Sequence, residues 1–109
     1  MWIRRDVAKK SDLFLIAPAT TNVITKISSG IANDALTTLV LSVKCPVVIC
    51  PAMNSEIYKN PITQENISYL KKIGYYFVGP EKGELACGDE DIGRMSDSVK
   101  IISEIKKIL

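Results

Sequence analysis

Two short runs of apolar residues constrain the fold of this chain more than any other feature. Residues 13–17 (Leu-Phe-Leu-Ile-Ala) and 46–50 (Pro-Val-Val-Ile-Cys) are continuously apolar over the length of a strand. Such runs are typical of strands buried on both faces, whereas half-exposed strands alternate apolar and polar residues. A third run, residues 75–78, follows further along the chain. The three runs predict a parallel sheet covered by helices on both sides.

Segments with helical periodicity separate these runs. Glycine or proline residues mark several of the boundaries, and the last helix is amphipathic with a cap at Ser96 or Asp97. The predicted helices are residues 22–29, 31–42, 61–73 and 97–109. Alternating strands and helices predict an α/β fold, a three-layer doubly wound parallel sheet of the Rossmann-like type with right-handed crossovers.

Chain length, composition and net charge restrict both the number of domains and the class of protein. With 109 residues and 47% hydrophobic composition, the chain has room for one core, so we expect a single domain spanning residues 1–109. The net charge of +2 is scattered and gives no indication of nucleic-acid or acidic-membrane binding. No apolar run approaches the roughly 18 residues of a membrane span, and no export signal is recognisable, so we expect a cytoplasmic protein.

The cysteine and histidine content excludes several kinds of site. Three cysteines without C-x-x-C spacing, and no histidine, do not provide a disulfide framework or an ordinary zinc site. The acidic residues 89–91 do not match a calcium loop and are interpreted as solvated, so no metal is expected. Without histidine, general acid–base catalysis must use other groups or a cofactor.

Three segments follow the predicted strands and should meet at one edge of the sheet. In α/β sheets ligands bind beyond the carboxyl ends of the strands, here residues 18–23, 51–58 and 79–95. The first leads into a helix N-terminus, where free N–H groups and hydroxyls can hold a phosphate or the oxygen-rich edge of a cofactor. Ordinary capping by Thr20, Thr21 or Asn22 is the alternative.

Two side chains in the other segments can do chemistry. Asn54 can donate a hydrogen bond to a substrate carboxylate without adding charge, or it can cap a helix while Met53 fills core space. Cys87 lies among glycines in an expected loop, where a thiol can act as an acid or a nucleophile. Cys45 and Cys50 border a buried strand and are interpreted as inert core thiols.

Several motifs occur in order along the chain: Ala-Pro-Ala-Thr-Thr-Asn (17–22), Pro-Ala-Met-Asn (51–54) with Ile-Tyr at 57–58, Ala-Cys-Gly-Asp (86–89) and Gly-Arg-Met (93–95). Together they resemble the motifs of the phosphopantothenoylcysteine decarboxylases, members of the flavin-containing cysteine decarboxylases. The resemblance runs from about residue 12 to the end and includes the Gly-Ile-Ala-Asn-Asp segment at 30–34.

The resemblance implies a role for each residue of the candidate site. Asn54 would bind the substrate carboxylate, and Cys87 would be the catalytic proton donor. The FMN-binding residues would be Thr20, Thr21, Asn22, Val23 and Ala52, and the substrate-covering flap would include Glu84, Ala86 and Met95.

The implied reaction is FMN-dependent decarboxylation of 4'-phosphopantothenoylcysteine to 4'-phosphopantetheine in coenzyme A synthesis. FMN would carry the difficult redox chemistry. Family members are homo-oligomers, trimers or dodecamers built from trimers, so the same is expected here.

Two departures from the family pattern lead us to expect a partial domain. The family histidine would fall at or beside Arg4, and the family's first strands and flavin-phosphate loop have no counterpart in this sequence. We therefore expect activity to need a separate N-terminal half. The alternatives are a non-catalytic regulatory or assembly protein on the same fold, a peptidyl-cysteine decarboxylase, or a relative of the flavin prenyltransferases. Cys87 favours the coenzyme A enzyme over the peptidyl-cysteine decarboxylases.

Overall fold

A mostly parallel sheet forms the centre of the molecule. The computed structural model describes residues 2–4, 12–84 and 90–109. The sheet order is β1-β2-β3-β4, with β2 paired in parallel to β3 and β3 in parallel to β4. The strands are β1 (Trp2–Arg4), β2 (Asp12–Ala19), β3 (Val47–Pro51) and β4 (Tyr76–Phe77). The parallel sheet predicted from the apolar runs is confirmed.

Strand β1 is an addition to the predicted sheet. It pairs antiparallel with the start of β2, with Ile3 opposite Leu13. A strand of three residues is too short to show a period of two in the sequence, and its partner lies outside its local segment.

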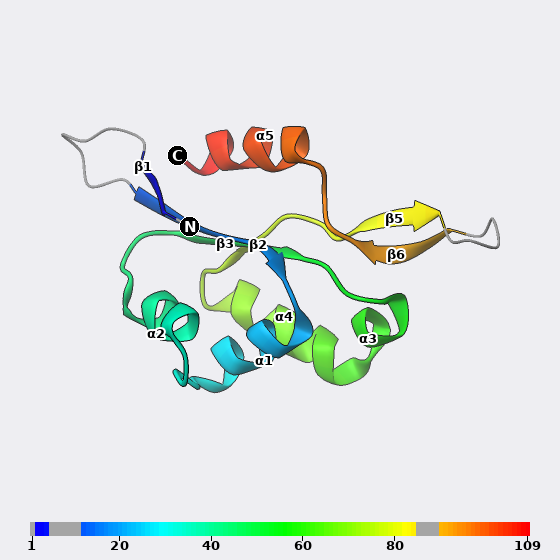
Figure 1. Ribbon diagram of the computed structural model, residues 1–109, viewed down its shortest axis with the longest axis horizontal. Helices are drawn as coiled ribbons and strands as arrows, with labels where there is room; N and C mark the ends of the chain where they lie inside the picture. Colours follow the sequence, from blue (N-terminus) through cyan, green and yellow to red (C-terminus); the bar gives the residue numbers. More distant parts are fainter. Residues whose placement is uncertain (1, 5–11, 85–89) are drawn as a thin grey trace.

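Helices cover both faces of the sheet, as predicted for a three-layer α/β fold (Figure 1). Phe14 and Ile16 of β2 belong to the core on the side of α1, α2 and α4, and Leu13 and Leu15 to the core on the side of α5. Successive residues of a strand point to opposite faces, so a continuous apolar run fills both cores. The longer helices are α1 (Thr21–Ser29), α2 (Ala35–Ser42), α4 (Pro61–Lys72) and α5 (Ser98–Ile108).

Side-chain caps determine where these helices begin. The α2 helix starts at Ala35, four residues later than predicted, because the Asp34 carboxylate accepts the N–H of Thr37 at 2.8 Å. Asp97 caps α5 by accepting the N–H of Lys100 at 2.9 Å, as the sequence indicated. None of the helices in the described ranges is long and apolar enough to cross a membrane.

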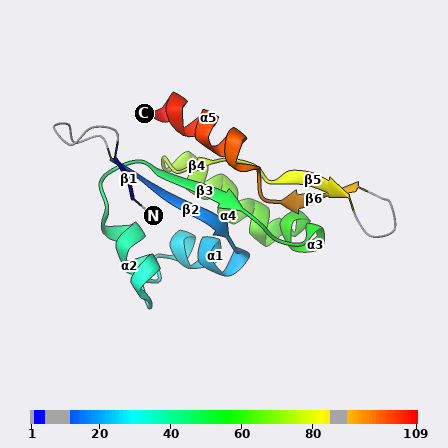
Figure 2. The ribbon, with the colours of Figure 1, turned by 45° about the horizontal axis from the view of Figure 1, so that its top comes forward.

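Two elements depart from the predicted loops. A short helix, α3 (Ser55–Lys59), precedes α4, and the expected loop at residues 79–95 contains an antiparallel hairpin. The hairpin strands are β5 (Glu81–Glu84) and β6 (Glu90–Arg94), and the hairpin projects beyond the sheet (Figure 2). These strands are rich in glycine and charged residues, which have low strand propensity, so local sequence predicts a loop. Cross-strand hydrogen bonding overrides that preference.

Candidate functional site

Backbone hydrogen bonds join the three segments that follow the strands. The N–H of Ala52 donates to the carbonyl oxygen of Ala19 at 3.0 Å, and the N–H of Met53 donates to the carbonyl oxygen of Gly93 at 2.9 Å. The turn after β3 is therefore fastened on one side to the turn after β2 and on the other to strand β6. The predicted convergence at one edge of the sheet is confirmed.

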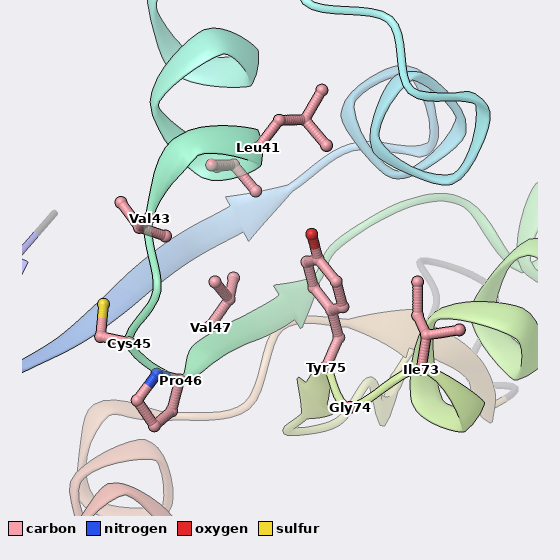
Figure 3. A pocket seen from close by; sticks show the side chains of 9 residues that line it. Leu41, Val43, Cys45, Pro46, Val47, Ile73, Gly74 and Tyr75 are labelled. Carbon is pink, nitrogen blue, oxygen red and sulfur yellow. The ribbon is translucent and has the colours of Figure 1, made fainter.

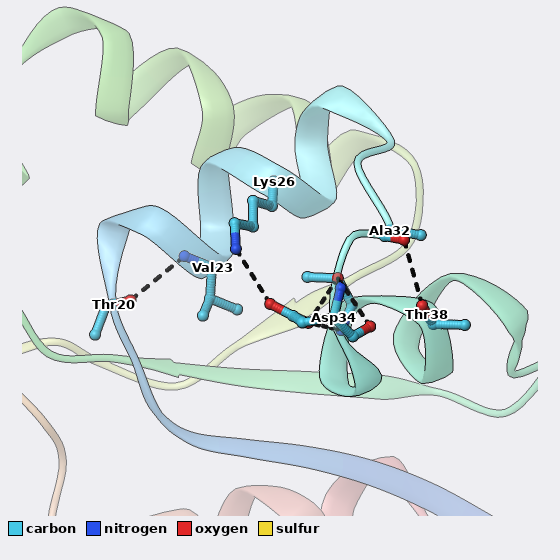
Figure 4. Close-up of polar contacts among 7 residues, drawn as sticks. Thr20, Val23, Lys26, Ala32, Asp34 and Thr38 are labelled. Atoms are coloured by element: carbon cyan, nitrogen blue, oxygen red, sulfur yellow. Dashed lines mark hydrogen bonds and ion pairs between the residues drawn. The ribbon is translucent and has the colours of Figure 1, made fainter.

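The turn after β2 leads into α1 through a threonine cap. Thr20 Oγ1 accepts the N–H of Val23 at 3.3 Å (Figure 4), so the capping interpretation holds for Thr20. Thr20 and Asn22 are exposed, while Thr21 and Val23 are half-buried. The first turn of α1 contains no acidic residue. Its remaining N–H groups and positive dipole end are therefore suited to an electronegative ligand.

Asn54 caps α3 and keeps half of its hydrogen-bonding capacity. Its Oδ1 accepts the N–H of Ile57 at 2.8 Å, and its side chain is exposed. Among the described residues, none accepts a hydrogen bond from its Nδ2 group, which carries two donors. Met53 packs against the core on the α1 side, and Ala52 is half-buried. The capping interpretation is correct, and it leaves a neutral donor available to a carboxylate.

Two of the predicted flap residues belong to the hairpin and to its connection with α5. Glu84 ends β5 and is paired in register with Glu90. Met95 follows β6 and packs, half-buried, against the core beneath α5. Ala86 and Cys87 lie outside the described residues. The part of the predicted flap that the structure describes is therefore built on one element, the β5–β6 hairpin.

A polar cluster that the sequence did not indicate fastens the base of the hairpin to α5. The Glu81 carboxylate accepts hydrogen bonds from Ser96 Oγ at 2.9 Å and from Lys100 Nζ. The hydrogen bonds from Lys100 and Ser96 lower the pKa of Glu81, and the bond to Glu81 raises the pKa of Lys100. Ser96 is fully buried. The three residues belong to no local motif, so only the tertiary structure identifies them.

Asp34 forms a second ionic group, at the start of α2. Its carboxylate is bonded to Thr37 and to Lys26 Nζ, at 3.1 Å from the latter (Figure 4). The bonds from the Thr37 N–H and hydroxyl, followed by that from Lys26, lower the pKa of Asp34 to about 2. Beside it is an open surface hollow of about 580 Å³, lined by Ala32, Asn33, Asp34, Ala35, Thr38 and Leu39.

A smaller cavity of about 180 Å³ lies at the edge of the sheet where strands β3 and β4 begin (Figure 3). Pro46 and Val47, at the beginning of β3, and Tyr75, just before β4, contribute to its wall together with the half-buried Cys45. Its position at the amino ends of the strands separates it from the three joined segments. Cys50 is fully buried, and burial raises the pKa of its thiol to about 11, which agrees with an inert core thiol.

This chain is similar to known proteins in sequence and in structure. The coenzyme A biosynthesis bifunctional protein CoaBC of Vibrio cholerae serotype O1 is 46% identical over 98 residues, covering 90% of this chain and 25% of that protein. A cysteine-to-serine variant of a PPC decarboxylase, complexed with pantothenoylaminoethenethiol, has a TM-score of 0.81 at 30% identity. The FMN-binding protein AtHal3 has a TM-score of 0.79 at 31% identity.

The matches extend over most of this chain but only part of its relatives. The decarboxylase alignment covers 87% of this chain and 53% of the other, and the AtHal3 alignment covers 87% and 52%. This chain thus spans about a quarter of CoaBC and about half of each compared structure. The sequence profile described as "Flavoprotein" matches residues 2–109. This chain therefore belongs to the flavoprotein family.

Proposed function

We propose that this chain is the FMN- and substrate-binding C-terminal part of a phosphopantothenoylcysteine decarboxylase. The reaction would convert 4'-phosphopantothenoylcysteine to 4'-phosphopantetheine in coenzyme A synthesis. The observation that carries the proposal is the pair of backbone hydrogen bonds, Ala52 to Ala19 and Met53 to Gly93, which joins the three motif-bearing segments. The names of the relatives, one a coenzyme A biosynthesis protein and one a PPC decarboxylase, support this substrate class.

The residues at the first two segments fit a flavin. The exposed Thr20 and Asn22, with half-buried Thr21 and Val23, present uncharged polar groups at a helix N-terminus. Ala52 is fastened beside them, and its single methyl group occupies little space at the turn. These five residues would hold FMN. When bound, FMN supplies the redox chemistry, oxidation of the cysteinyl thiol and the later reduction of the ene-thiol.

Two side chains of this chain would act on the substrate directly. The Nδ2 group of Asn54 would donate to the substrate carboxylate and orient it, while Oδ1 stays bound to the N–H of Ile57. A neutral donor leaves no unpaired charge behind when the carboxylate departs as carbon dioxide. The thiol of Cys87, which lies between β5 and β6 in the sequence, would give its proton to the product carbon. Glu84, Ala86 and Met95 would cover the substrate.

The complete enzyme requires more than these residues. The sequence contains no histidine, and the chain corresponds to about half of the compared decarboxylase. We propose that the part of the decarboxylase that this sequence does not cover supplies the flavin-phosphate loop and the base. Assembly into a trimer or dodecamer and a location in the cytoplasm stay predictions.

Co-expression tests the proposal. The chain is purified alone and together with the N-terminal half of a family decarboxylase, and flavin absorbance and carbon dioxide release from 4'-phosphopantothenoylcysteine are measured for each sample. We expect stoichiometric FMN and turnover only in the co-purified complex. A complex that holds FMN without releasing carbon dioxide would contradict this substrate, and a stable complex without FMN would contradict the flavin site.

A further inference from the structure

Gly93 is the extra residue of a β-bulge in the hairpin. Ile92 lies opposite Lys82, and the next pair along the ladder is Arg94 with Glu81. Two steps along β6 therefore match one step along β5, and Gly93 has no counterpart on β5 in this register. Its φ is +145°, a conformation that residues with a side chain rarely adopt. Because a bulge releases one residue from strand pairing, the carbonyl oxygen of Gly93 is available to a group outside the hairpin.

This carbonyl oxygen binds the turn that carries Asn54. It accepts the N–H of Met53 at 2.9 Å. A Cβ atom built on Gly93 would overlap the carbonyl oxygen of Met53 and would lie 3.4 Å from the carbonyl carbon of Asn54. All of these atoms belong to the backbone, so no change of rotamer can relieve the overlap. A side chain at residue 93 must therefore push β6 and the turn apart.

The position of Asn54 should depend on this contact, because the helix that follows it has little anchorage of its own. Helix α3 has five residues, none of them buried, although the half-buried Tyr58 packs against the core. The carbonyl oxygen of Asn54 accepts the N–H of Tyr58 at 3.0 Å, and its Oδ1 accepts the N–H of Ile57 at 2.8 Å. Asn54 and α3 therefore move together, and the direction of Nδ2 follows the backbone of the turn that β6 holds at Met53.

From these contacts we infer that Gly93 is a positioning residue for substrate binding, whose bulge sets the turn so that Nδ2 of Asn54 faces the substrate carboxylate. This inference rests on the proposed function, which assigns the carboxylate to Asn54. The flavin side of the turn is held separately, because the N–H of Ala52 donates to the carbonyl oxygen of Ala19. Loss of the contact at Gly93 should therefore weaken recognition of the carboxylate and leave FMN binding unchanged.

The test measures affinity for substrate and for product in the co-purified complex. The product, 4'-phosphopantetheine, lacks the carboxylate and so reports on the rest of the site. For Gly93→Ala we expect the substrate KM to rise about tenfold, the size of a lost hydrogen bond to a charged group, with the product inhibition constant and the FMN content unchanged. Gly74 also has a positive φ, +109°, but an added Cβ there meets nothing within 4 Å. Gly74→Ala therefore controls for backbone strain and should keep the wild-type values.

A double-mutant cycle links the effect to Asn54. Asn54→Ala removes the Nδ2 donor, so adding Gly93→Ala to this variant should raise KM by less than about twofold, because both changes remove the same contact. A tenfold rise in both backgrounds would overturn the inference. So would a wild-type KM in Gly93→Ala, equal losses of substrate and product affinity, loss of FMN, or the same rise in Gly74→Ala.

An inactive wild-type complex, or an Asn54→Ala variant with the wild-type KM, contradicts the proposed function instead. The positioning is then measured without substrate, from the side-chain amide NMR signals of Asn54 in the same complex. Gly93→Ala should shift these signals and accelerate hydrogen exchange at the Met53 N–H, and Gly74→Ala should change neither. Unchanged Asn54 signals in Gly93→Ala would overturn the inference.

If Gly93→Ala does not fold, the hydrogen bond can be removed from its other end. An ester in place of the Met53 amide lacks the N–H that donates to Gly93 and adds no bulk. It should raise the substrate KM and leave the product inhibition constant and the FMN content unchanged. An unchanged KM in this variant would overturn the inference.

Discussion

The two ends of the Asn54 side-chain amide differ in their hydrogen bonding. Oδ1 accepts the N–H of Ile57 and starts α3, while the Nδ2 donors are not used by any residue in the described part of the chain. Asn60 provides a matched comparison, because its Oδ1 caps α4 by accepting the N–H of Ile62 at 2.9 Å. The two asparagines share the capping role, and only Asn54 lies on the turn fastened to β6.

Replacing Asn54 by aspartate separates capping from substrate binding. The introduced carboxylate would still accept the N–H of Ile57 but would present a negative charge to the substrate carboxylate. Two like charges about 4 Å apart repel by about 1 kcal/mol in water and about 4 kcal/mol at an effective dielectric constant near 20. We expect Asn54→Asp to raise KM by about fivefold or more in the co-purified complex, with FMN content unchanged.

Asn60→Asp is the control for this measurement, and it should keep the wild-type KM and a similar resistance to urea. Steady-state kinetics over a range of substrate concentrations distinguish the two variants. The same KM for Asn54→Asp and Asn60→Asp would remove Asn54 from the substrate site and leave it as a helix cap alone.

At the scale of elements, α5 is the described helix that covers the second face of the sheet. Its Ile101 and Ile105 pack against Leu13, Leu15 and Val48, while Ile102 on the same helix is 52% exposed. Ile105 is 5% exposed. We therefore expect the buried side of α5 to provide most of the stability that this helix adds to the fold.

Truncating Ile105 should cost much more stability than truncating Ile102. Ile105→Ala removes buried methyl groups and leaves a cavity, which typically lowers the free energy of unfolding by about 2–5 kcal/mol. Ile102→Ala removes a side chain that is about half exposed, and we expect a change of less than about 1 kcal/mol. Urea denaturation followed by circular dichroism measures both values. Similar losses in the two variants would contradict the observed packing of α5.

The sequence predicts those helices and strands whose buried residues form a pattern that is visible in the local sequence. The apolar run in β2 contributes side chains to both cores, Phe14 on one face of the sheet and Leu13 on the other. A continuous apolar run therefore indicates a strand that is buried on both faces. The hairpin β5–β6 has no such pattern, because its register depends on pairing between two charged segments. The start of α2 was misplaced because the Asp34 cap outweighs the helical pattern of the preceding residues.

The sequence predicts where the candidate site lies, but it does not predict the tertiary hydrogen bonds and the ion pair that hold the site together. Topology alone places the segments containing Thr20, Asn54 and Met95 after neighbouring strands, and hence near one edge. The contact between Met53 and Gly93 depends on a tertiary approach of two backbones, for which a single glycine is a weak signal. The ionic group of Glu81 and Lys100 spans 19 residues and likewise has no local signature.

At the scale of the whole molecule, the projecting hairpin makes the chain elongated. The radius of gyration is 14.4 Å and the principal extents are 50 × 30 × 23 Å, compared with a radius of about 13 Å for a compact chain of this length. The core remains concentrated at β2 and β3, where every residue of β3 is buried. That residues 1–109 constitute one partial domain stays a prediction, and the distribution of local stability can test it.

Amide hydrogen exchange should divide the chain into a stable centre and a less stable periphery. Strand β3 is paired on both sides, and its Ile49 carbonyl oxygen also accepts the N–H of Val78 at 3.0 Å, so its amides can open only when the sheet does. The hairpin is joined to the rest through Gly93 and the Glu81 cluster, and it should open locally. We expect amides of Val48 and Ile49 to exchange about a hundredfold or more slowly than those of Lys82 and Ile92. Exchange that is uniformly fast would instead show that the sheet needs the complementary half to form a persistent core.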